Sequence, residues 1–426
     1  MAKQIIIKGT PVVAANEVLV ADSSSKIPAV DGSAVTTMAG GNITGTIPTA
    51  RLDSGTTANK LVVLGGSGLP AVDGSLLTGI VSHTTSASDP TISTNPATGV
   101  GTEWINSTSG KQFICTDATA GENVWKCSGG GSGDVEPYIY QGTTYGYSHG
   151  GNPARDVIER FSFTSDGDGA DVGNLVAGNQ YVNGTHSTTH GYCHGGSVNR
   201  IEKYQFVAST NSTQVGTLSE KRDSAAGLTS KTKGYVCGGY FAPSQRNNIW
   251  SYSYVSDGNA TDVADLTTIR LQSGGSTDTV NGYIMTGESI GHPSGAAYTG
   301  VDKFVYATEA NSTDIGDLTV GGQRAGGSSS LTYGYCVGGA SPVYDVIDKF
   351  NFAGSFTATD VGNLVHGTRG GTGGSSSTTY GFTSGGFYAP VGGVNEITKF
   401  AFASDGNSTD VGNLTVTKMY SGATSF

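Results

Sequence analysis

Aromatic side chains that could stack on sugar rings recur in the C-terminal two-thirds of the chain, and arginines recur near them. The aromatic residues stand in segments of variable length, and the arginines open separate segments rich in small residues. The candidates are Tyr240, Phe241, Tyr298, Tyr344, Phe387 and Tyr388, with Arg222, Arg270, Arg324 and Arg369. Variable loops on a constant scaffold are a common place for binding. We expect these ten residues to form a ligand-binding surface, provided that the fold brings their segments to one face.

Two other groups of side chains resemble incomplete metal sites. His149 and His194 occupy the same position in neighbouring repeats, but the sequence supplies no further ligands for a metal ion. We expect both to lie in the core or to line a channel. Asp166, Asp168 and Asp171 resemble part of a calcium loop, although no bidentate Glu completes it. The sequence therefore predicts no metal and no cofactor, with bound calcium as the alternative.

The elements that must position these residues repeat six times from residue 143 onward. One segment reads TTYGYSHGG, and its leading glycine returns at Gly146, Gly191, Gly234, Gly282, Gly334 and Gly381. An aromatic segment such as IERFSF follows in every copy, then a segment such as ADVGNL, then a segment with a basic residue and small residues. Successive copies are 43 to 52 residues apart, which is the length of a four-stranded blade.

Alternation of aromatic residues at i and i+2 places them on one face of a strand, as at Phe161 and Phe163. A single blade cannot bury both faces, so the copies must stack, and closing them into a ring removes exposed sheet edges. The last segment, YSGATSF, could complete the first blade, and Tyr138–Gly142 could fill the same place. The basic residues of the aromatic segments are expected to pair with aspartates of the Asp-Val-Gly-x-Leu segments between blades; these are Arg160, Lys203, Lys303, Lys349 and Lys399. The Asn-x-Ser/Thr triplets are expected to be turns.

This repeat resembles the kelch repeat, in which a double glycine ends the second strand of each blade. The resemblance covers about residues 143–426 and implies a six-bladed kelch-like β-propeller. The sequence departs from the family in two respects. It lacks the tryptophan of the fourth strand, and Thr286 stands where the first glycine of the pair is expected in the fourth copy.

The N-terminal third has a different character. Residues 1–83 are rich in Gly, Ser, Thr and Ala and contain a duplicated PAVDGS. Short glycine-punctuated repeats of the type GxIxxxIPxARLD, as at residues 41–53, resemble the intertwined shafts of trimeric phage tail fibres, which implies a virion attachment and fibre-shaft segment. A disordered linker is the alternative. Residues 84–136 are expected to form a small β module, similar to one found in phage fibres, with a Gly-rich hinge. Its predicted core is Trp104, Ile105, Phe113, Ile114 and Trp125. Residues 137–426 are the predicted propeller head.

Composition excludes several classes of protein. The formal net charge is −11 and no basic run occurs, so nucleic acid is not an expected partner. No apolar stretch is long enough to span a bilayer, and no secretory leader is evident at the start. The five cysteines form no paired framework or metal spacing. No hydrolase, phosphate-loop or sialidase motif appears, so we do not expect an enzyme.

The resemblances together imply a structural fibre of a bacteriophage virion, assembled in the host cytoplasm as a homotrimer. The N-terminal part would attach to other tail or capsid proteins, and the propeller would recognise a host-cell-surface glycan or receptor. One alternative is a decorating or structural capsid or tail protein whose propeller contacts other virion proteins. Another is a glycan-degrading fibre enzyme, which would need paired carboxylates.

Overall fold

The computed structural model describes residues 83–128, 135, 138–208, 210–289, 298–339, 344–365, 373–388 and 391–426. The paired strands run antiparallel to one another, and no helix occurs among these residues. The predicted all-β class is therefore confirmed. The predicted fibre-shaft segment, residues 1–83, lies outside the described residues except for His83, which begins the first strand.

A small four-stranded sheet comes first. It comprises β1 (His83–Ser86), β2 (Glu103–Asn106), β3 (Gln112–Asp117) and β4 (Val124–Cys127), in that order. Phe113, Cys115 and Trp125 are its fully buried residues, and the Trp104 ring meets the Trp125 ring edge-on at 5.9 Å. Ile114 was expected in this core, but it is 38% exposed because it points to the opposite face from its neighbour Phe113.

Six further four-stranded antiparallel sheets follow. Sheet 1 contains β5 (Tyr145–His149), β6 (Arg155–Ser162) and β7 (Ala170–Asn179), completed by β30 (Gly422–Ser425). Sheet 2 contains β8 (Val182–His186), β9 (His190–Gly195), β10 (Arg200–Gln205) and β11 (Thr213–Thr217). Sheet 3 contains β12 (Ala226–Thr229), β13 (Lys233–Cys237), β16 (Asn248–Ser253) and β17 (Thr261–Asp265), with a hairpin of β14 (Tyr240–Phe241) and β15 (Ser244–Gln245).

The remaining sheets repeat this order. Sheet 4 contains β18 (Gly274–Thr277), β19 (Asn281–Met285), β20 (Gly300–Val305) and β21 (Thr313–Asp317). Sheet 5 contains β22 (Gly326–Ser329), β23 (Tyr333–Gly339), β24 (Tyr344–Asn351) and β25 (Ala358–Asn363). Sheet 6 contains β26 (Gly373–Ser376), β27 (Tyr380–Tyr388), β28 (Gly392–Ala401) and β29 (Thr409–Lys418).

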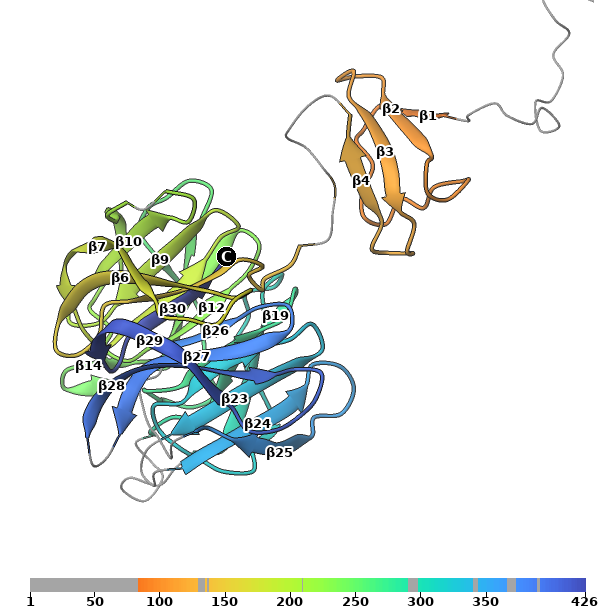
Figure 1. Cartoon of the computed structure of the whole chain (residues 1–426). Helices are drawn as coiled ribbons and strands as arrows, with labels where there is room; N and C mark the ends of the chain where they lie inside the picture. The colour runs from red at the N-terminus through yellow and green to blue at the C-terminus, as the bar shows by residue number, and fades with distance from the viewer. Residues whose placement is uncertain are drawn as a thin grey trace, which may run out of the picture. The chain divides into compact units, whose positions relative to one another are not determined.

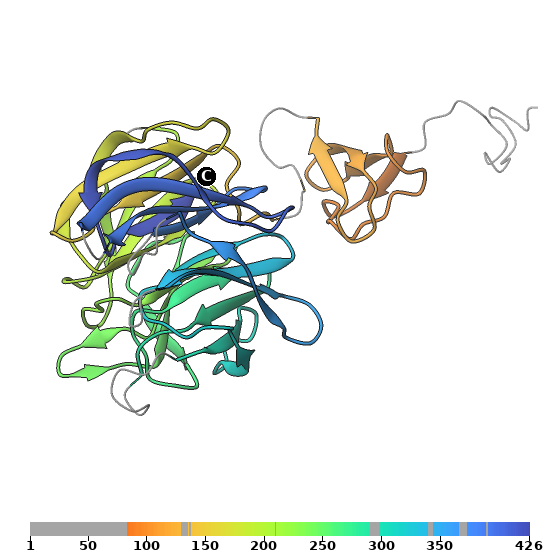
Figure 2. The ribbon, with the colours of Figure 1, turned by 60° about the horizontal axis from the view of Figure 1, so that its bottom comes forward.

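One edge strand of each sheet faces a common centre; in sheet 1 this strand is β30. These inner strands contact one another in the cyclic order β8, β12, β18, β22, β26, β30 and back to β8, and the two ribbon views show the sheets arranged around them (Figures 1 and 2). The arrangement is propeller-like. Glycines on the inner strands permit this approach: a Cβ on Gly327 would collide with the carbonyl oxygen of Gly275, and one on Gly374 with that of Gly327.

The C-terminal strand completes the first sheet. β30 pairs with β5 from Gly422 opposite His149 to Ser425 opposite Gly146, so of the two alternatives for this place the C-terminal segment occupies it. Residues 138–142 instead lie across one end of the central channel. There the hydroxyl of Tyr140 donates to the carbonyl of Ser330, and Gly142 N donates to Ser376 O at 2.9 Å.

Aromatic residues fill the space between adjacent sheets. The Tyr235 ring of sheet 3 stacks on Tyr306 of sheet 4 at 5.1 Å, and the Tyr283 ring of sheet 4 stacks on Phe352 of sheet 5 at 4.8 Å. The leading glycine of each repeat has a related purpose. A Cβ on Gly146 would overlap the ring of Phe161, its partner on the adjacent strand. The repeated Gly-Tyr therefore makes room for one ring and supplies another.

Polar side chains also join the sheets. The Asn-x-Ser/Thr triplets, expected to be simple turns, reach back to the preceding sheet: Asn311 Oδ1 accepts from Asp265 N at 3.0 Å, and Asn407 Oδ1 from Asn363 N at 2.9 Å. Among the described residues, three of the five expected ion pairs between sheets form, but their partners are aspartates of the turns before the Asp-Val-Gly-x-Leu strands. These pairs are Lys203–Asp257, Lys349–Asp405 and Lys399–Asp166.

Candidate functional site

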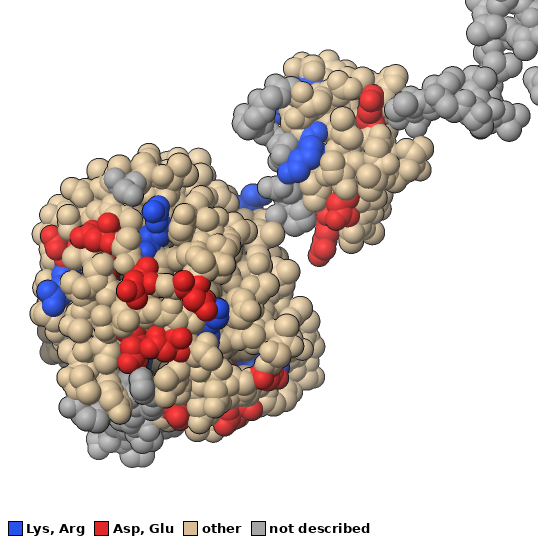
Figure 3. Space-filling view, in the orientation of Figure 1, with Lys and Arg blue, Asp and Glu red and all other residues tan. Residues whose placement is uncertain are grey.

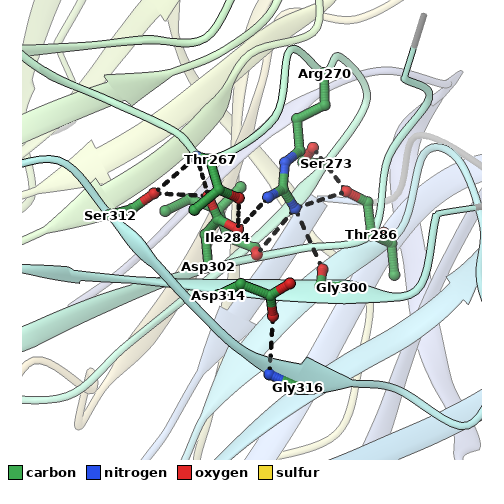
Figure 4. Close-up of polar contacts among 10 residues, drawn as sticks. All are labelled: Thr267, Arg270, Ser273, Ile284, Thr286, Gly300, Asp302, Ser312, Asp314 and Gly316. Carbon is green, nitrogen blue, oxygen red and sulfur yellow. Dashed lines mark hydrogen bonds and ion pairs between the residues drawn. The ribbon is translucent and has the colours of Figure 1, made fainter. Parts of the chain in front are cut away.

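Arg270 is a structural residue rather than part of a binding surface. Its guanidinium pairs with the carboxylate of Asp302, and both side chains have no exposed area. Asp302 also accepts from Thr267 N and Thr267 Oγ1 at 2.7 Å each and from Ser312 Oγ at 2.6 Å. Figure 4 shows this cluster between β20 and its neighbours. A charge this deep is stable only when it is paired and hydrogen-bonded, so the predicted role of Arg270 in binding is wrong.

Arg222 occupies the equivalent position in sheet 3 and is also buried, with 1% of its surface exposed. Its guanidinium lies 4.1 Å from the ring centre of Trp250 and 3.0 Å from Glu220. Burial lowers the pKa of Arg222 to about 10, an effect that Glu220 opposes. The predicted binding role of Arg222 is therefore wrong as well. Arg222 thus combines cation–π stacking on Trp250 with an ion pair to Glu220, whereas the carboxylate partner of Arg270 is the fully buried Asp302.

Lys418 has the same position in sheet 1. Its Nζ lies 2.6 Å from Glu159 Oε2, and both side chains are fully buried. Lys418 therefore neutralises a buried acid and has no exposed area. Arg369, the remaining predicted basic residue of this kind, lies outside the described residues.

The six predicted aromatic residues separate into two groups. Tyr298 covers the guanidinium of Arg270 with its ring centre at 4.6 Å. Tyr344 fills the corresponding space in sheet 5, where Gly322 leaves room for its ring. Both are therefore packing residues. Tyr240 and Phe241 form β14 on sheet 3, and Phe387 and Tyr388 end β27 on sheet 6. All four are half-buried, and the structure does not bring these two pairs together in one pocket.

Arg324 stands two residues further along its repeat than Arg222 and Arg270, and it has different surroundings. The pairing of each inner strand with the second strand of its sheet aligns the repeats. In this alignment the residues equivalent to Arg324 in the other sheets are Tyr181, Ser224, Gln272 and Tyr420. These five residues, which we call the channel collar, line one end of the central channel. The sixth counterpart falls outside the described residues.

Every collar residue has a left-handed backbone. The φ angles of Tyr181, Ser224, Gln272, Arg324 and Tyr420 are 59°, 58°, 60°, 66° and 55°. Non-glycine residues rarely adopt this conformation, and tertiary structure must hold it. Hydrogen bonds from sheet to sheet do so: Ser224 N donates to Tyr181 O, Gln272 N to Ser224 O and Arg324 N to Gln272 O, at 2.9, 2.8 and 2.6 Å. The backbone of the collar is thus tied to its neighbours while its side chains differ.

The collar side chains surround a small cavity of about 50 Å³. The rings of Tyr181 and Tyr420 lie 4.9 Å apart, and the Arg324 guanidinium is 5.2 Å from the Tyr420 ring centre. Arg324 Nε donates to Gln272 Oε1 at 3.0 Å, and Asn152 Nδ2 donates to the Tyr181 hydroxyl at 3.1 Å. This volume accommodates one small polar group rather than a whole sugar ring.

Among the described residues that line the cavity, the charge is positive. Arg324 is the charged residue among those lining the cavity, and no Asp or Glu occurs among the described lining residues. Burial raises the pKa of the Tyr420 hydroxyl, against the opposing effect of Arg324, so this hydroxyl is protonated at neutral pH. Figure 3 shows groups of Asp and Glu side chains, with some Lys and Arg side chains among them, on the face turned toward the viewer.

Sequence reasoning found Arg324 but missed Tyr181, Ser224, Gln272 and Tyr420. Their residue types differ from arginine and are common throughout the chain, and no motif marks them. The signal that could have found them is position, because each stands three residues before the inner-strand residue at the same place in its sheet: Gly184, Gly227, Gly275, Gly327 and Ala423. Alignment of the repeats on that strand would have separated Arg324 from Arg222 and Arg270.

The candidate metal ligands have other roles. His149 Nδ1 lies 3.1 Å from the Tyr204 hydroxyl, and burial lowers the pKa values of His149 and His194 to about 3, so both are neutral core residues. Asp166 pairs with Lys399, and Asp168 accepts from Asn413 N at 2.9 Å. No group of three or more potential metal ligands occurs in the described part of the chain.

Comparison with known proteins adds little. No protein-family model matches the chain, and no curated protein matches it. Among solved structures, one titled "Structure of YjhT" is similar with a TM-score of 0.48 and 13% sequence identity, over 57% of this chain and 86% of that chain. A similarity of this extent carries no argument about function. Among the described residues no helix is long and apolar enough to cross a membrane.

Proposed function

We propose that this protein is a structural fibre of a bacteriophage virion. Its N-terminal part attaches to other tail or capsid proteins, and its C-terminal part is a six-bladed kelch-like β-propeller that recognises a glycan on the host cell. The protein acts as a homotrimer and has no enzymatic activity. The fibre assignment rests on the resemblance of residues 1–83 to phage fibre shafts.

The assignment as a kelch-like propeller is supported by the cyclic contacts of the six inner strands and by the glycine pairs. Gly195 and Gly196 have φ angles of 71° and 79°, so the residue pair that ends the second strand needs left-handed backbone. Thr286, the departure from the kelch pattern, adopts the same conformation with φ of 57°. The backbone of the fourth copy therefore keeps the turn despite the substitution.

The observation that carries the recognition role is the placing of the collar. The inner strands run from the collar toward the channel end that Tyr140 covers, so the chain enters the propeller at the end opposite the collar. Because residues 138–142 occupy the other end of the channel, we place recognition at the collar end. Tyr240 and Tyr388 lie in the loops that extend the second and third strands, which emerge at this same end.

Binding of the full-length protein to host cells and to a glycan array tests the proposal. Alanine at Tyr181 or Tyr420 should reduce binding at least tenfold, and alanine at Tyr240 or Tyr388 should reduce it as well if the loops share the surface. Tyr333, which follows the turn at the opposite end and is 37% exposed, is the matched control, and its replacement by alanine should leave binding unchanged.

Other outcomes would identify the other candidates. Release of reducing sugar from a bound glycan would make the protein an enzyme. If these alanine variants are no longer incorporated into phage particles but still bind host cells, the result would favour a decorating protein. Equal binding by the Tyr181, Tyr420 and Tyr333 variants would refute recognition at the collar. A monomer in sedimentation analysis of the full-length chain would refute the trimer.

A further inference from the structure

We infer that the channel collar binds an oxyanion, a carboxylate or phosphate group projecting from a cell-surface polymer, and that Arg324 holds its charge. This inference rests on the recognition role proposed above and names the ligand class of the same site. It follows from which hydrogen-bonding groups of the collar are already engaged and which remain.

The collar retains several hydrogen-bond donors. Gln272 Oε1 is engaged by Arg324 Nε at 3.0 Å, so the amide nitrogen of Gln272 remains to donate. The Tyr181 hydroxyl accepts from Asn152 at 3.1 Å and can donate its own proton. The terminal nitrogens Nη1 and Nη2 of Arg324 have no hydrogen bond to another described residue. These groups are complementary to an acceptor with several lone pairs, and only an anion also matches the charge.

The backbone of the collar contributes no competing acceptor over three of its positions. The carbonyl oxygens of Tyr181, Ser224 and Gln272 accept hydrogen bonds from the next collar residue around the ring. The guanidinium of Arg324 lies 5.2 Å from the ring centre of Tyr420. This cation–π contact holds the Arg324 side chain at the mouth of the channel. Arginine is suited to this task because its planar fork donates two parallel hydrogen bonds to a carboxylate or phosphate.

The size of the cavity limits what enters. About 50 Å³ admits a group of carboxylate or phosphate size, whereas the remainder of a polymer must stay outside and lie over the rings of Tyr181 and Tyr420. A neutral polysaccharide offers no group that satisfies the charge of Arg324. The collar should therefore distinguish anionic from neutral polymers of similar length.

The test uses the full-length protein and four polymers: polygalacturonate, which carries carboxylates, a glycerol phosphate teichoic acid, dextran sulfate and neutral dextran. Affinity is measured by biolayer interferometry at two salt concentrations. The variant Arg324→Gln places in sheet 5 the side chain that Gln272 already supplies in sheet 4 at a similar φ of 60°, so the fold should tolerate it. Arg324→Lys keeps the charge but loses the fork.

The wild type should bind polygalacturonate or teichoic acid, and the preferred polymer distinguishes carboxylate from phosphate. Arg324→Gln should weaken this binding at least tenfold and Arg324→Lys about threefold to tenfold. The control Lys231→Gln removes the same charge from an exposed turn at the other end of the propeller and should have no effect. Equal binding to dextran sulfate and the preferred polymer, unaffected by Arg324→Gln, would show non-specific attraction and refute the inference.

The two proposals can fail separately. If host cells bind the protein in a manner that depends on Tyr240 and Tyr388 but not on Arg324, the recognition role stands and the oxyanion site is refuted. If no variant of the collar or of the loops alters cell binding, the recognition role itself fails.

Discussion

Replacement of Asp302 tests whether the buried ion pairs hold the sheets together. Asp302 and Arg270 are fully buried, and Asp302 accepts three further hydrogen bonds from Thr267 and Ser312. In Asp302→Ala the guanidinium of Arg270 loses its partner without gaining access to water. Breaking a buried pair from one side costs about 3–5 kcal/mol, so we expect a loss of unfolding free energy in this range.

A double variant separates the unpaired charge from the packing. Arg270→Met combined with Asp302→Leu removes both charges and keeps most of the apolar volume. Its loss of stability should be smaller than that of Asp302→Ala by about 2 kcal/mol or more, because no buried charge is left unpaired. The matched control is Asp166→Asn, which removes the partner of Lys399 at the rim, where the Asp166 side chain is 58% exposed. An exposed pair contributes only about 0–1 kcal/mol.

Equilibrium unfolding in guanidinium chloride, followed by circular dichroism and by tryptophan fluorescence, measures these differences. Coincidence of the two transitions allows the midpoints to be converted into free energies. The reasoning is refuted if Asp302→Ala costs about as little as Asp166→Asn, or if the double variant is less stable than Asp302→Ala. Either result would mean that the guanidinium reaches water or another partner when Asp302 is absent.

Three further changes test other parts of the structure. His149 and His194 have pKa values of about 3 in the folded protein, against an ordinary value of 6.5, so the free energy of unfolding should fall as the pH is lowered from 6.5 to 3, by up to about 1.4 kcal/mol per pH unit for each histidine. The double variant His149→Met, His194→Cys carries residue types found at the equivalent position in other sheets, and its urea midpoint should depend less on pH over this range. An unchanged slope would contradict the burial of the two histidines. Gly327→Ala should cost about 3 kcal/mol by thermal unfolding because the new Cβ meets the neighbouring backbone, whereas Ala423→Gly at the equivalent position should cost about 1 kcal/mol; equal losses would refute the close approach. Deletion of residues 420–426 removes β30 and exposes the edge of β5, so light scattering should detect aggregates that the intact chain does not form, and a soluble, cooperatively unfolding product would show that the ring does not depend on this strand.

Much of the fold could be predicted because the repeats impose the same packing problem six times. Gly146 and Phe161 recur as a pair in the sequence, and the structure pairs them on adjacent strands, with the ring covering the glycine. Local alternation and spacing are enough to predict such strands. They were not enough to decide between Tyr138–Gly142 and the C-terminal segment as the closing strand, because both have a suitable pattern.

The arginines show why the site was harder to predict. Arg270 and Asp302 are 32 positions apart in the sequence, and nothing local indicates that they meet. Arginine is usually exposed, so the recurrence of Arg222 and Arg270 suggested a surface. Arg324, which looks alike in sequence, lies in a different register and lines the channel. A shift of two residues relative to the inner strand thus separates a packing residue from a candidate ligand-binding residue.

The distribution of variation among the six sheets supports placing recognition at the collar. Positions that face a neighbouring sheet must satisfy the same geometry each time, and they repeat one residue type or exchange equivalent solutions, as when Trp250 replaces a carboxylate beside Arg222. Collar positions are constrained only in their backbone, since hydrogen bonds from sheet to sheet fix the left-handed φ angles whatever the side chain. A tyrosine, a serine, a glutamine and an arginine therefore occupy the same place with nearly the same φ angle. A ring of identical backbone positions with unlike side chains gives an asymmetric surface at the mouth of a symmetric scaffold, and an asymmetric surface is what discrimination between ligands requires.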